Sequence, residues 1–459
     1  MSPSHSRKLR WVPLVAATLA ASATGCDPQQ GSWGLSAITG MTTPPDDPGL
    51  GCGVALPPDP ASDARERCAF GAGAPASTTL GIAPSVAKAI PIRHVVVLMK
   101  ENRSFDHLLS RIHDRGQPGA EPIPASYVNP DLSNAPVHPF HATTTCIPYD
   151  PGHQFESVQT CLDSGKMDGF VRNAATTTSS DGTFVMSGYD ETDLPFYYFL
   201  ARSFALDDRH FAPLATGTFA NRAFLLLGTN AGIVDTGIDY PPPDTPSIFE
   251  LLMNAGYTWA AYTDSFPFDG ALDWSAGDPG VLPLSDLYDA LDRGTLPNVA
   301  FVDGEENIED DHPVADLQHG ESWVKTIYDH AVKSPEWQRM AILWTYDEAG
   351  AFADHVPPAP GACDPDPSIP LIAGRGPRVP MVAISPWAKR GYTSHVVEDH
   401  TAITRFIEAI FDLPALTARD ANAGALFDLF DFSCGRDLSI PAAPEPGKGG
   451  CAGVAPQPD

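Results

Sequence analysis

The sequence predicts an α/β protein of three layers, in which helices cover both faces of a mostly parallel central sheet. Across residues 85–440, apolar runs of strand length alternate with segments whose apolar residues recur at helical spacing, and this alternation is typical of parallel sheets. Two of the most apolar runs lead directly into acidic or amide residues, and α/β proteins place their ligands at such strand ends. No internal repeat or second linker divides this stretch, which indicates one large domain.

The expected elements follow one another in a regular order. Five apolar runs, several of them β-branched, are expected as strands: Val95–Met99, Trp259–Tyr262, Val299–Val302, Ile342–Tyr346 and Val379–Ile384. Five segments with an apolar face are expected as helices: Leu194–Phe204, Ser247–Ala255, Leu284–Arg293, Gly320–Val332 and Thr401–Phe411. The irregular stretches Gly116–Gly165 and Tyr346–Arg378 are then long loops over the ligand-bearing edge of the sheet.

The amino-terminal residues 1–25 are typical of an export signal. A basic start is followed by an apolar stretch, Trp11–Ala23, that is too short to span a bilayer. The ending Ala23-Thr24-Gly25-Cys26 resembles a bacterial lipoprotein cleavage box, which would make Cys26 a lipid-modified membrane anchor. Because Ala23 stands where Leu is more usual, plain secretion stays open. We expect an exported protein, either a lipoprotein of the cell envelope or a secreted or periplasmic protein.

The flanks of the domain have a different composition from its interior. Residues 26–84 are rich in Pro and Gly and predict a tether with an irregular lead-in, while residues 441–459 predict a flexible tail. The expected catalytic domain is 85–440. A formal net charge of −29 argues against nucleic acid as a partner and against electrostatic docking on anionic membranes.

The cysteines fit an oxidising compartment. Cys52–Cys68 and Cys146–Cys161 are near neighbours in sequence, and each pair would close a loop of ordinary size. Spacing does not fix the connectivity, and one of the seven cysteines after Cys26 must stay unpaired or bond elsewhere. No pair has metal-ligand spacing with a histidine close by, so a thiolate zinc site is not expected.

The stretch IRHVVVLMKENRSFDHLL, residues 92–109, carries the first candidate site. A buried strand leads into Glu101 and Asn102, and a helical pattern follows. Both side chains offer oxygen to a hard cation. The alternative is a simple helix start, with Asn102 as the cap and Glu101 complementing the helix dipole.

The second candidate is Thr218, within the stretch FAPLATGTFANRAFLLLGT at 211–229. A hydroxyl at a strand-to-helix junction can accept a phosphoryl group while helix-end N–H groups hold the phosphate oxygens. Helix caps of this kind are far commoner than nucleophiles, so an N-cap threonine is the competing interpretation.

The third candidate is the acidic pair Asp347–Glu348, which follows the expected strand Ile342–Tyr346. Adjacent acids at that place repel each other unless a cation or hydrogen bonds stabilise them. Gly350 permits a tight turn, and a second polar pair, Asp354–His355, comes next. Solvated loop acids are the alternative.

Four loop histidines are the last candidates: His153, His312, His319 and His400. Lone histidines are usually surface residues or satisfied core residues. His312 stands in a run of acids, which would favour its protonated form. A protonated histidine can clamp an anion or supply the acid for a leaving group.

Together these stretches resemble the phosphoesterase family that includes bacterial and plant phospholipase C enzymes and an acid phosphatase branch, within the alkaline phosphatase-like superfamily. The resemblance extends from about Ile92 to Leu413 and keeps the order of the motifs. The matching motifs are ENRSFDH at 101–107, GKMDGFV at 165–171 preceded by His153, LPFYYFLARSFALDDRHF at 194–211 followed by Thr218, Asn221 and Arg222, DDHP at 310–313, TYDEAGAFADHV at 345–356, RVPMVAISPWAKRG at 378–391 and DHTAITRFIE at 399–408.

The resemblance implies an alkaline phosphatase-like fold with long loops over the active site, and a role for each matched residue. One divalent metal ion would be held by Glu101, Asn102, Thr218, Asp347 and Glu348. The hydroxyl of Thr218 would be the nucleophile, with Asn221 and Arg222 binding substrate. Phosphate binding or proton transfer would fall to His153, His312 and His355, with Asp354 orienting His355.

Two positions depart from the family pattern. Ala220 replaces the Pro of T-x-P-N-R, and Ala351 replaces the second Gly of D-E-x-G-G. Neither residue is an expected metal ligand. Both affect loop geometry, because Pro and Gly fix backbone angles that Ala does not.

The chemistry expected from these residues is a two-step displacement. A free threonine hydroxyl is a weak nucleophile at neutral pH, so it needs a cation or a base to lose its proton. An oxygen-rich ligand set favours a hard or borderline cation, which also neutralises charge on the transferred phosphoryl group. Thr218 would attack phosphorus, a histidine would protonate the leaving alcohol, and water would cleave the phosphothreonine.

Three functions remain open at this point. A phospholipase C that acts on phospholipid is favoured, and an acid phosphatase that acts on small phosphate esters is the alternative. The aromatic run Phe196–Phe199 could contact lipid, but at this spacing such residues are more often core. A non-catalytic surface lipoprotein is less favoured because every expected ligand is present. A sulfatase is less favoured because the sulfatase cysteine motif is absent.

Overall fold

The computed structural model describes residues 54–56, 59–234, 245–265, 280–360, 363, 374–433 and 439–450. The expected export signal and Cys26 therefore lie outside the described residues. Among the described residues, no helix combines the length and apolar character needed to cross a membrane.

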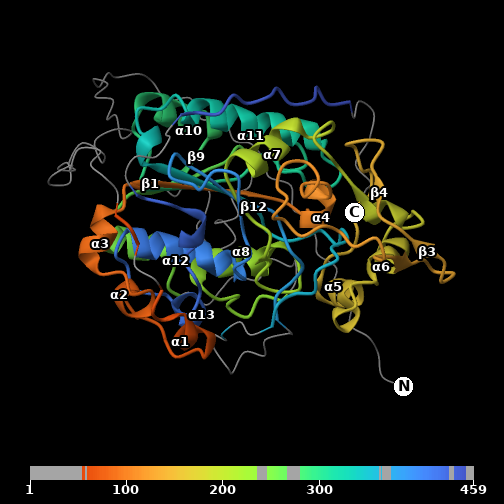
Figure 1. Cartoon of the computed structure of the whole chain (residues 1–459), viewed down its shortest axis with the longest axis horizontal. Coiled ribbons are helices and arrows are strands. Elements are labelled where there is room, and N and C mark those ends of the chain that lie inside the picture. Colours follow the sequence, from red (N-terminus) through yellow and green to blue (C-terminus); the bar gives the residue numbers. More distant parts are fainter. Residues whose placement is uncertain are drawn as a thin grey trace, which may run out of the picture. The chain divides into compact units, whose positions relative to one another are not determined.

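An eight-stranded sheet forms the centre of the domain (Figure 1). Its strands run in the order β13-β6-β12-β11-β1-β10-β8-β9, and every neighbouring pair is parallel except the two made by β12. The strands are β1 (His94–Lys100), β6 (Ala205–Asp207), β8 (Trp259–Tyr262), β9 (Val281–Leu282), β10 (Val299–Val302), β11 (Met340–Tyr346), β12 (Met381–Ile384) and β13 (Tyr392–Ser394). The predicted, mostly parallel sheet is confirmed.

The two central strands explain why the sheet forms here. β1 and β11 are apolar along nearly their whole length, and β11 is buried at every position, as strands covered on both faces require. Their register pairs Leu98 with Trp344 and Lys100 with Tyr346. Both strands therefore end at the same level, which brings the residues after Lys100 and Tyr346 side by side.

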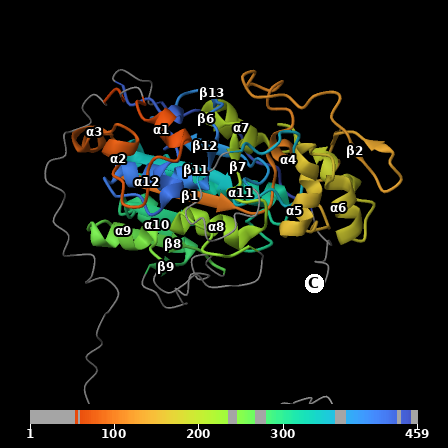
Figure 2. The same cartoon turned by 90° about the horizontal axis from the view of Figure 1, so that it is seen from below.

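Helices cover both faces of the sheet, as predicted. Figure 1 shows α7, α10 and α11 above the sheet and α8 and α12 below it, and Figure 2 shows the domain turned to bring α8, α9 and α12 into view. The helices are α1 (Ser62–Glu66), α2 (Ala76–Thr79), α3 (Pro84–Ala89), α4 (Phe105–Leu109), α5 (Phe155–Leu162), α6 (Phe170–Thr177), α7 (Pro195–Ser203), α8 (Thr218–Leu227), α9 (Ile248–Asn254), α10 (Leu284–Arg293), α11 (Leu317–Ala331), α12 (His400–Ile410) and α13 (Ala418–Ala421).

The predicted helices and strands agree with the structure to within about three residues at their ends. The largest difference is at α11, which begins at Leu317 and not at Gly320. Asp316 causes the earlier start, because its side chain caps the helix by accepting a hydrogen bond from Gln318 N–H. The aromatic run Phe196–Phe199 lies on α7 and is buried, which confirms the core interpretation.

A smaller cap lies beyond the carboxyl ends of the central strands. It contains α5 and α6 with the short strands β2 (Asn129–Pro130), β3 (Pro136–Val137), β4 (Phe140–His141) and β5 (Ser187–Gly188). Its own hydrophobic cluster includes Val158, Phe170 and Met186, and Phe352 from the loop after β11 packs into that cluster. The cap is thus fastened to the loop that carries the acidic motif. The remaining pair, β7 (His210–Phe211) and β14 (Glu398–Asp399), forms a separate parallel ribbon.

The disulfides differ from the expected pairing. Cys68 is bonded to Cys363, so the expected Cys52–Cys68 bridge is wrong. Cys161 is free and buried, so Cys146–Cys161 is wrong too, although Cys146 is disulfide-bonded. Folding joins cysteines that are 295 residues apart, which local spacing cannot predict.

The two flanks lie against the domain where they are described. The lead-in residues Ala76, Leu80 and Ile82 pack in one cluster with Ala409 of α12. Residues 439–450, near the end of the chain, reach α11, where Gly449 N–H donates to the Gln318 side chain. Figure 1 shows this last segment running beside α10 and α11.

Candidate active site

Acidic and amide residues from β1 and β11 meet where these strands end. Glu101–Asn102 and Asp347–Glu348 come directly after the paired Lys100 and Tyr346, and all four are buried. Asp347 Oδ1 accepts a hydrogen bond from Asn102 N–H at 3.0 Å, and Glu348 Oε2 accepts one from Gly350 N–H at 2.8 Å. The parallel register thus brings together four of the five expected metal ligands.

The Asn102 side-chain amide lies between two carboxylates and His312. One end of the amide lies 2.6 Å from Glu348 Oε1 and 3.3 Å from Glu101 Oε2, and the other lies 2.9 Å from His312 Nε2. Without a cation, the amide nitrogen donates to the two carboxylates and the oxygen accepts from His312. With a cation among the carboxylates, the same end must present its oxygen, because a cation takes oxygen ligands.

The electrostatics of this cluster fit a divalent cation. Burial raises the pKa of Glu101 well above its ordinary value, and neighbouring Asp347 adds to the shift despite Arg222. Burial also raises the pKa of Glu348 to about 8, against the opposing effect of His153. Within the described part of the chain, Asp347 Oδ2 is buried without a hydrogen-bond partner. A cation would replace the protons and satisfy this oxygen.

The Thr218 hydroxyl faces the carboxylate cluster. Thr218 is the first residue of α8, and the N-cap is Gly217, with no side-chain capping bond. The alternative of an N-cap threonine is therefore wrong. Thr218 Oγ1 donates to Glu101 Oε2 at 3.2 Å, so the fifth expected ligand joins the other four.

Asn221 supports the backbone that precedes Thr218. Its Nδ2 donates to the carbonyls of Thr216 (2.9 Å) and Gly217 (3.0 Å), and its Oδ1 accepts from Leu214 N–H. Both amide hydrogens are thus used within the loop. Asn221 was expected to bind substrate, but its hydrogen bonds position the residue next to the hydroxyl instead.

Arg222 lies one helical turn after Thr218 and contacts three carboxylates, the most distant being Asp347, whose Oδ2 lies 3.7 Å from Nε. Its Nη2 donates to Glu101 Oε1 at 2.7 Å, and its Nη1 donates to Asp303 Oδ1 at 2.5 Å. The sequence analysis missed Asp303, which follows β10 directly. The same strand-end signal that identified Glu101 and Asp347 could have found it. Asp303 neutralises part of the guanidinium charge and holds it against Glu101.

His153 and His312 face the same cluster from loops. His153 Nε2 lies 3.9 Å from Glu348 Oε1, and the two imidazole centroids are 6.1 Å apart. Burial opposes protonation of His153, but the carboxylates of Glu348 and Asp150 outweigh it and raise its pKa. Asp150 also lies 3.9 Å from His312 Nε2; it was not predicted, because no strand precedes it.

The loop that carries His312 is anchored on the opposite face of the sheet. Asp311 Oδ2 lies 2.8 Å from Lys100 Nζ and accepts hydrogen bonds from the hydroxyls of Tyr197 (2.9 Å) and Tyr346 (2.6 Å). Lys100 and Asp311 are fully buried, and removing one member would leave the other as an uncompensated charge. This network fixes the residue next to His312.

His355 and Asp354 belong to a separate polar cluster. His355 Nδ1 lies 2.7 Å from Asp106 Oδ2, and none of its contacts within the described chain reaches the five expected metal ligands. Asp354 Oδ1 instead accepts from Arg378 Nε at 3.0 Å. The hydrogen bond that orients the His355 ring thus comes from Asp106 and not from Asp354, which belongs to the same cluster.

A family model of the phosphoesterase family matches residues 92–414. The chain belongs to the phosphoesterase family. Non-specific phospholipase C1 of Arabidopsis thaliana is 32% identical over 384 residues, which cover 74% of this chain and 71% of that protein. Phospholipase C A of Mycobacterium tuberculosis is 28% identical over 77% of this chain and 80% of its own. This member of the phosphoesterase family is accordingly a phosphoric ester hydrolase.

Solved structures give a weaker similarity. A protein in the alkaline phosphatase superfamily from Vibrio parahaemolyticus is 11% identical over 69% of this chain and 78% of its own, with a TM-score of 0.32. Human ectonucleotide pyrophosphatase/phosphodiesterase 5 has a TM-score of 0.33 and 13% identity, over 52% of this chain and 94% of its own.

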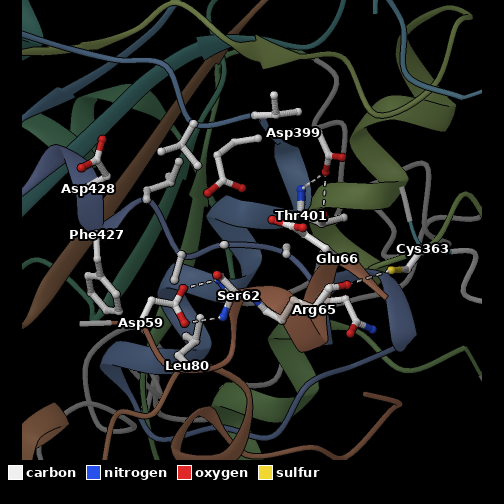
Figure 3. Close-up of a pocket in the computed structure, with 18 of the residues that line it drawn as sticks. Asp59, Ser62, Arg65, Glu66, Leu80, Cys363, Asp399, Thr401, Phe427 and Asp428 are labelled. Atoms are coloured by element: carbon white, nitrogen blue, oxygen red, sulfur yellow. Dashed lines mark hydrogen bonds and ion pairs between the residues drawn. The ribbon is translucent and has the colours of Figure 1, made fainter. Parts of the chain in front are cut away.

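A cavity of about 700 Å³ beside α1 and α12 is not the active site (Figure 3). It is lined by none of the residues expected to bind metal or act in catalysis. Its polar groups pair with each other: the Arg65 side chain binds Asp59, and Asp399 Oδ1 accepts from Thr401. These pairs lie where the lead-in packs against the domain, which indicates a structural role for this region.

Proposed function

We propose that this phosphoesterase is an exported, metal-dependent enzyme of the phospholipase C type that acts through a phosphothreonine at Thr218. The observation that carries the proposal is the convergence of Glu101, Asn102, Asp347 and Glu348 around a hydroxyl that lies 3.2 Å from Glu101 Oε2. These residues would hold one divalent cation, which would lower the pKa of the nucleophile and neutralise charge on the phosphoryl group.

The residues of the chain divide the reaction between them. Thr218 Oγ1 forms the bond to phosphorus while the bond to the leaving oxygen breaks, and the hydroxyl proton passes to Glu101 Oε2, from which it returns when the Thr218 ester is cleaved. His153 and His312 face the same space, and a protonated imidazole there supplies the proton of the leaving alcohol. Water then attacks phosphorus, which releases phosphate ester and restores the Thr218 hydroxyl. Arg222 and Asp303 hold Glu101 throughout.

The preference for phospholipid is supported by the phospholipase C relatives, and a second cavity, of about 530 Å³, lies beside α4. Asp106 lines it together with apolar side chains that include Ile123, Phe140 and Met186. Polar and charged side chains, among them Arg111, His113 and Asp190, make up the rest of the lining, so the apolar part could receive an acyl chain while the polar part faces a head group or water. If the protein prefers small soluble esters to phospholipid, it is a phosphomonoesterase of the acid phosphatase type, which is the alternative function.

The central experiment compares wild-type protein with Thr218→Ala and Thr218→Ser on phosphatidylcholine vesicles and on p-nitrophenyl phosphate. We expect a loss of turnover in Thr218→Ala, partial activity in Thr218→Ser, and a phosphorylated Thr218 in acid-quenched wild-type protein by mass spectrometry. Full activity in Thr218→Ala would exclude the mechanism. Inactivity of the wild-type protein on every ester, with divalent metal added, would leave the non-catalytic alternative.

Substrate preference is tested by Phe140→Ser, with Met253→Ser on α9 as a matched control because both side chains are about half exposed. Phe140→Ser should lower turnover of phosphatidylcholine and leave that of p-nitrophenyl phosphate unchanged, while Met253→Ser should change neither. Equal effects on both substrates would favour the phosphomonoesterase.

Export and lipid attachment at Cys26 are part of the same proposal. The described disulfides support an oxidising compartment. Intact-mass analysis of the mature protein from cells would show a diacylglycerol adduct on Cys26 if the chain is a lipoprotein, and an unmodified, cleaved chain if it is secreted.

A further inference from the structure

His400 contacts the backbone of the acidic pair Asp347–Glu348. It is the first residue of α12 and is fully buried, and its Nε2 lies 2.7 Å from the backbone carbonyl of Asp347. A carbonyl oxygen can only accept, so the imidazole must carry hydrogen on Nε2. The bond therefore fixes the peptide that joins the two acids Asp347 and Glu348.

A second buried histidine fixes the orientation of the first. His400 Nδ1 lies 3.2 Å from His210 Nε2, and the two rings stack with centroids 5.4 Å apart. Because His400 uses its hydrogen on Nε2, its Nδ1 is the acceptor and His210 donates. Burial lowers the pKa of His400 to about 4, which agrees with a neutral pair. For two neutral rings, only one arrangement of hydrogens satisfies both the bond from His210 to His400 and the bond from His400 to the Asp347 carbonyl.

The same helix holds the nucleophile side of the site. One turn after His400, Thr404 Oγ1 donates to the carbonyl of Leu225 on α8 at 2.7 Å, and α8 begins with Thr218. Helix α12 thus bonds to the strand end that carries the acids and to the helix that carries the hydroxyl. Its placement sets the spacing between Thr218 and Asp347.

We propose that His400, backed by His210, is a positioning residue that holds the Asp347 peptide so that the acidic pair faces Glu101 and Asn102. This inference rests on the proposed metal centre for its functional consequence. Partners that orient metal ligands typically contribute about 10–100-fold to metal affinity. The Asp347 carboxylate is the common acceptor for Asn102 N–H and Glu348 N–H, so its displacement also exposes those two amides.

The experiment uses full-length protein with His400→Leu, His400→Gln and His400→Asn. Gln places an amide N–H near the position of the imidazole Nε2, whereas Asn is too short to reach Asp347 and Leu has no donor. The matched control is His94→Leu, which removes an imidazole contact of 2.9 Å to the Pro297 carbonyl at the other end of β1. Two quantities are measured: amide hydrogen exchange of chelator-treated protein, and Mn²⁺ affinity by electron paramagnetic resonance.

We expect faster exchange at Asn102 and Glu348 and Mn²⁺ binding weaker by about 10–100-fold in His400→Leu and His400→Asn, with most of the loss recovered in His400→Gln. His94→Leu should match wild-type protein in both. Unchanged exchange in His400→Leu and His400→Asn overturns the positioning role, as does an equal change in His94→Leu. If His400→Leu does not fold, the Gln and Asn variants decide. Wild-type protein that binds no Mn²⁺ while exchange responds to His400 would refute the proposed metal centre and leave the positioning role standing.

Discussion

Thr218 donates its hydroxyl hydrogen to Glu101 across 3.2 Å, which joins the first turn of α8 to the end of β1. Arg222 binds the other oxygen of the same carboxylate at 2.7 Å. One oxygen of Glu101 therefore faces the Thr218 hydroxyl, and the other faces the Arg222 guanidinium. The geometry allows Glu101 to bind a metal ion and orient the hydroxyl at the same time.

Replacing Glu101 should remove both functions. We expect Glu101→Gln to weaken Mn²⁺ binding by more than about 100-fold, since even partners one shell further out contribute about 10–100-fold, and to abolish ester hydrolysis. Binding is measured by electron paramagnetic resonance and turnover with p-nitrophenyl phosphate. Glu306→Gln, an exposed acid in a neighbouring loop, is the control and should change neither. Retained binding in Glu101→Gln would exclude this residue as a ligand.

The raised pKa of Glu348 predicts how pH affects the metal-free protein. The folded state holds a proton on Glu348 up to about pH 8, whereas the unfolded chain releases it near pH 4.5. Between these values the folded state binds more protons, so the free energy of unfolding falls as pH rises. The contribution of Glu348 is complete below pH 4.5 and is lost as pH rises through 8.

Urea denaturation of chelator-treated protein between pH 5 and pH 8.5 measures this effect. Wild-type protein should lose stability relative to Glu348→Gln as pH rises, because Gln resembles the protonated acid and does not titrate. Added Mn²⁺ should reverse the trend, since the cation binds the deprotonated form. A constant difference between the two proteins across this range would contradict the shifted pKa.

The turn after Glu348 predicts unequal effects of substitution at adjacent positions. Gly350 has φ +59°, and a Cβ there would lie 2.4 Å from the Asn102 carbonyl oxygen. Gly350→Ala should therefore destabilise the protein by more than about 2 kcal/mol, from left-handed strain of about 1–2 kcal/mol plus the clash, and should weaken Mn²⁺ binding by moving Asn102.

Ala351 has φ +54°, which glycine would adopt without strain, but its methyl is buried. In Ala351→Gly, relief of backbone strain adds about 1–2 kcal/mol to the free energy of unfolding. Loss of the buried methyl removes about 0.8 kcal/mol, and the greater entropy of glycine in the unfolded chain removes more. Ala351→Gly should stay within about 1 kcal/mol of wild type in urea denaturation. A larger loss in Ala351→Gly than in Gly350→Ala would contradict the strain argument at both positions.

Asp106 should control the titration of His355. Burial opposes protonation of His355, but the bond from Asp106 outweighs it and raises the pKa. In NMR titrations, Asp106→Asn should lower the His355 pKa more than Asp354→Asn does, since Asp354 bonds to Arg378 instead. A larger shift in Asp354→Asn would restore Asp354 as the orienting residue.

The Cys68–Cys363 bridge should make a large contribution to stability. It spans 295 residues, and cross-links over long loops typically stabilise by about 2–5 kcal/mol by restricting the unfolded chain. Cys68→Ser and Cys363→Ser should each lose about that much in urea denaturation, and the double variant should lose no more than either single one. Additive losses would mean that the cysteines act separately. Cys161→Ala, at a free cysteine, is the control.

Strand positions and the polar residues that meet at the strand ends could be predicted because their signals are local. An apolar β-branched run identifies β1, and parallel pairing brings the ends of β1 and β11 together wherever the intervening chain goes. Thr218 was recognisable only from its order within the family motifs. Its position after Gly217, inside α8, settles its role against that of a helix cap.

Partners that arise from the tertiary fold could not be predicted. Asp106 and Asp354 are both acids near His355, and only the course of the chain decides which one reaches the ring. Cys68 meets Cys363 for the same reason. His400 was visible as a candidate, but its contact with a backbone carbonyl leaves no sequence signal, because any residue supplies a carbonyl.

The pairing of β1 with β11 has a consequence for biosynthesis. Glu101 emerges early during translation, whereas Asp347 and Glu348 follow almost at the end of the domain, and helix α12 comes later still. A nascent chain that stops before β11 therefore contains Thr218 but lacks half of the acidic cluster that faces its hydroxyl. A phosphoesterase whose site needs both strand ends therefore stays incomplete until nearly its whole length has been made.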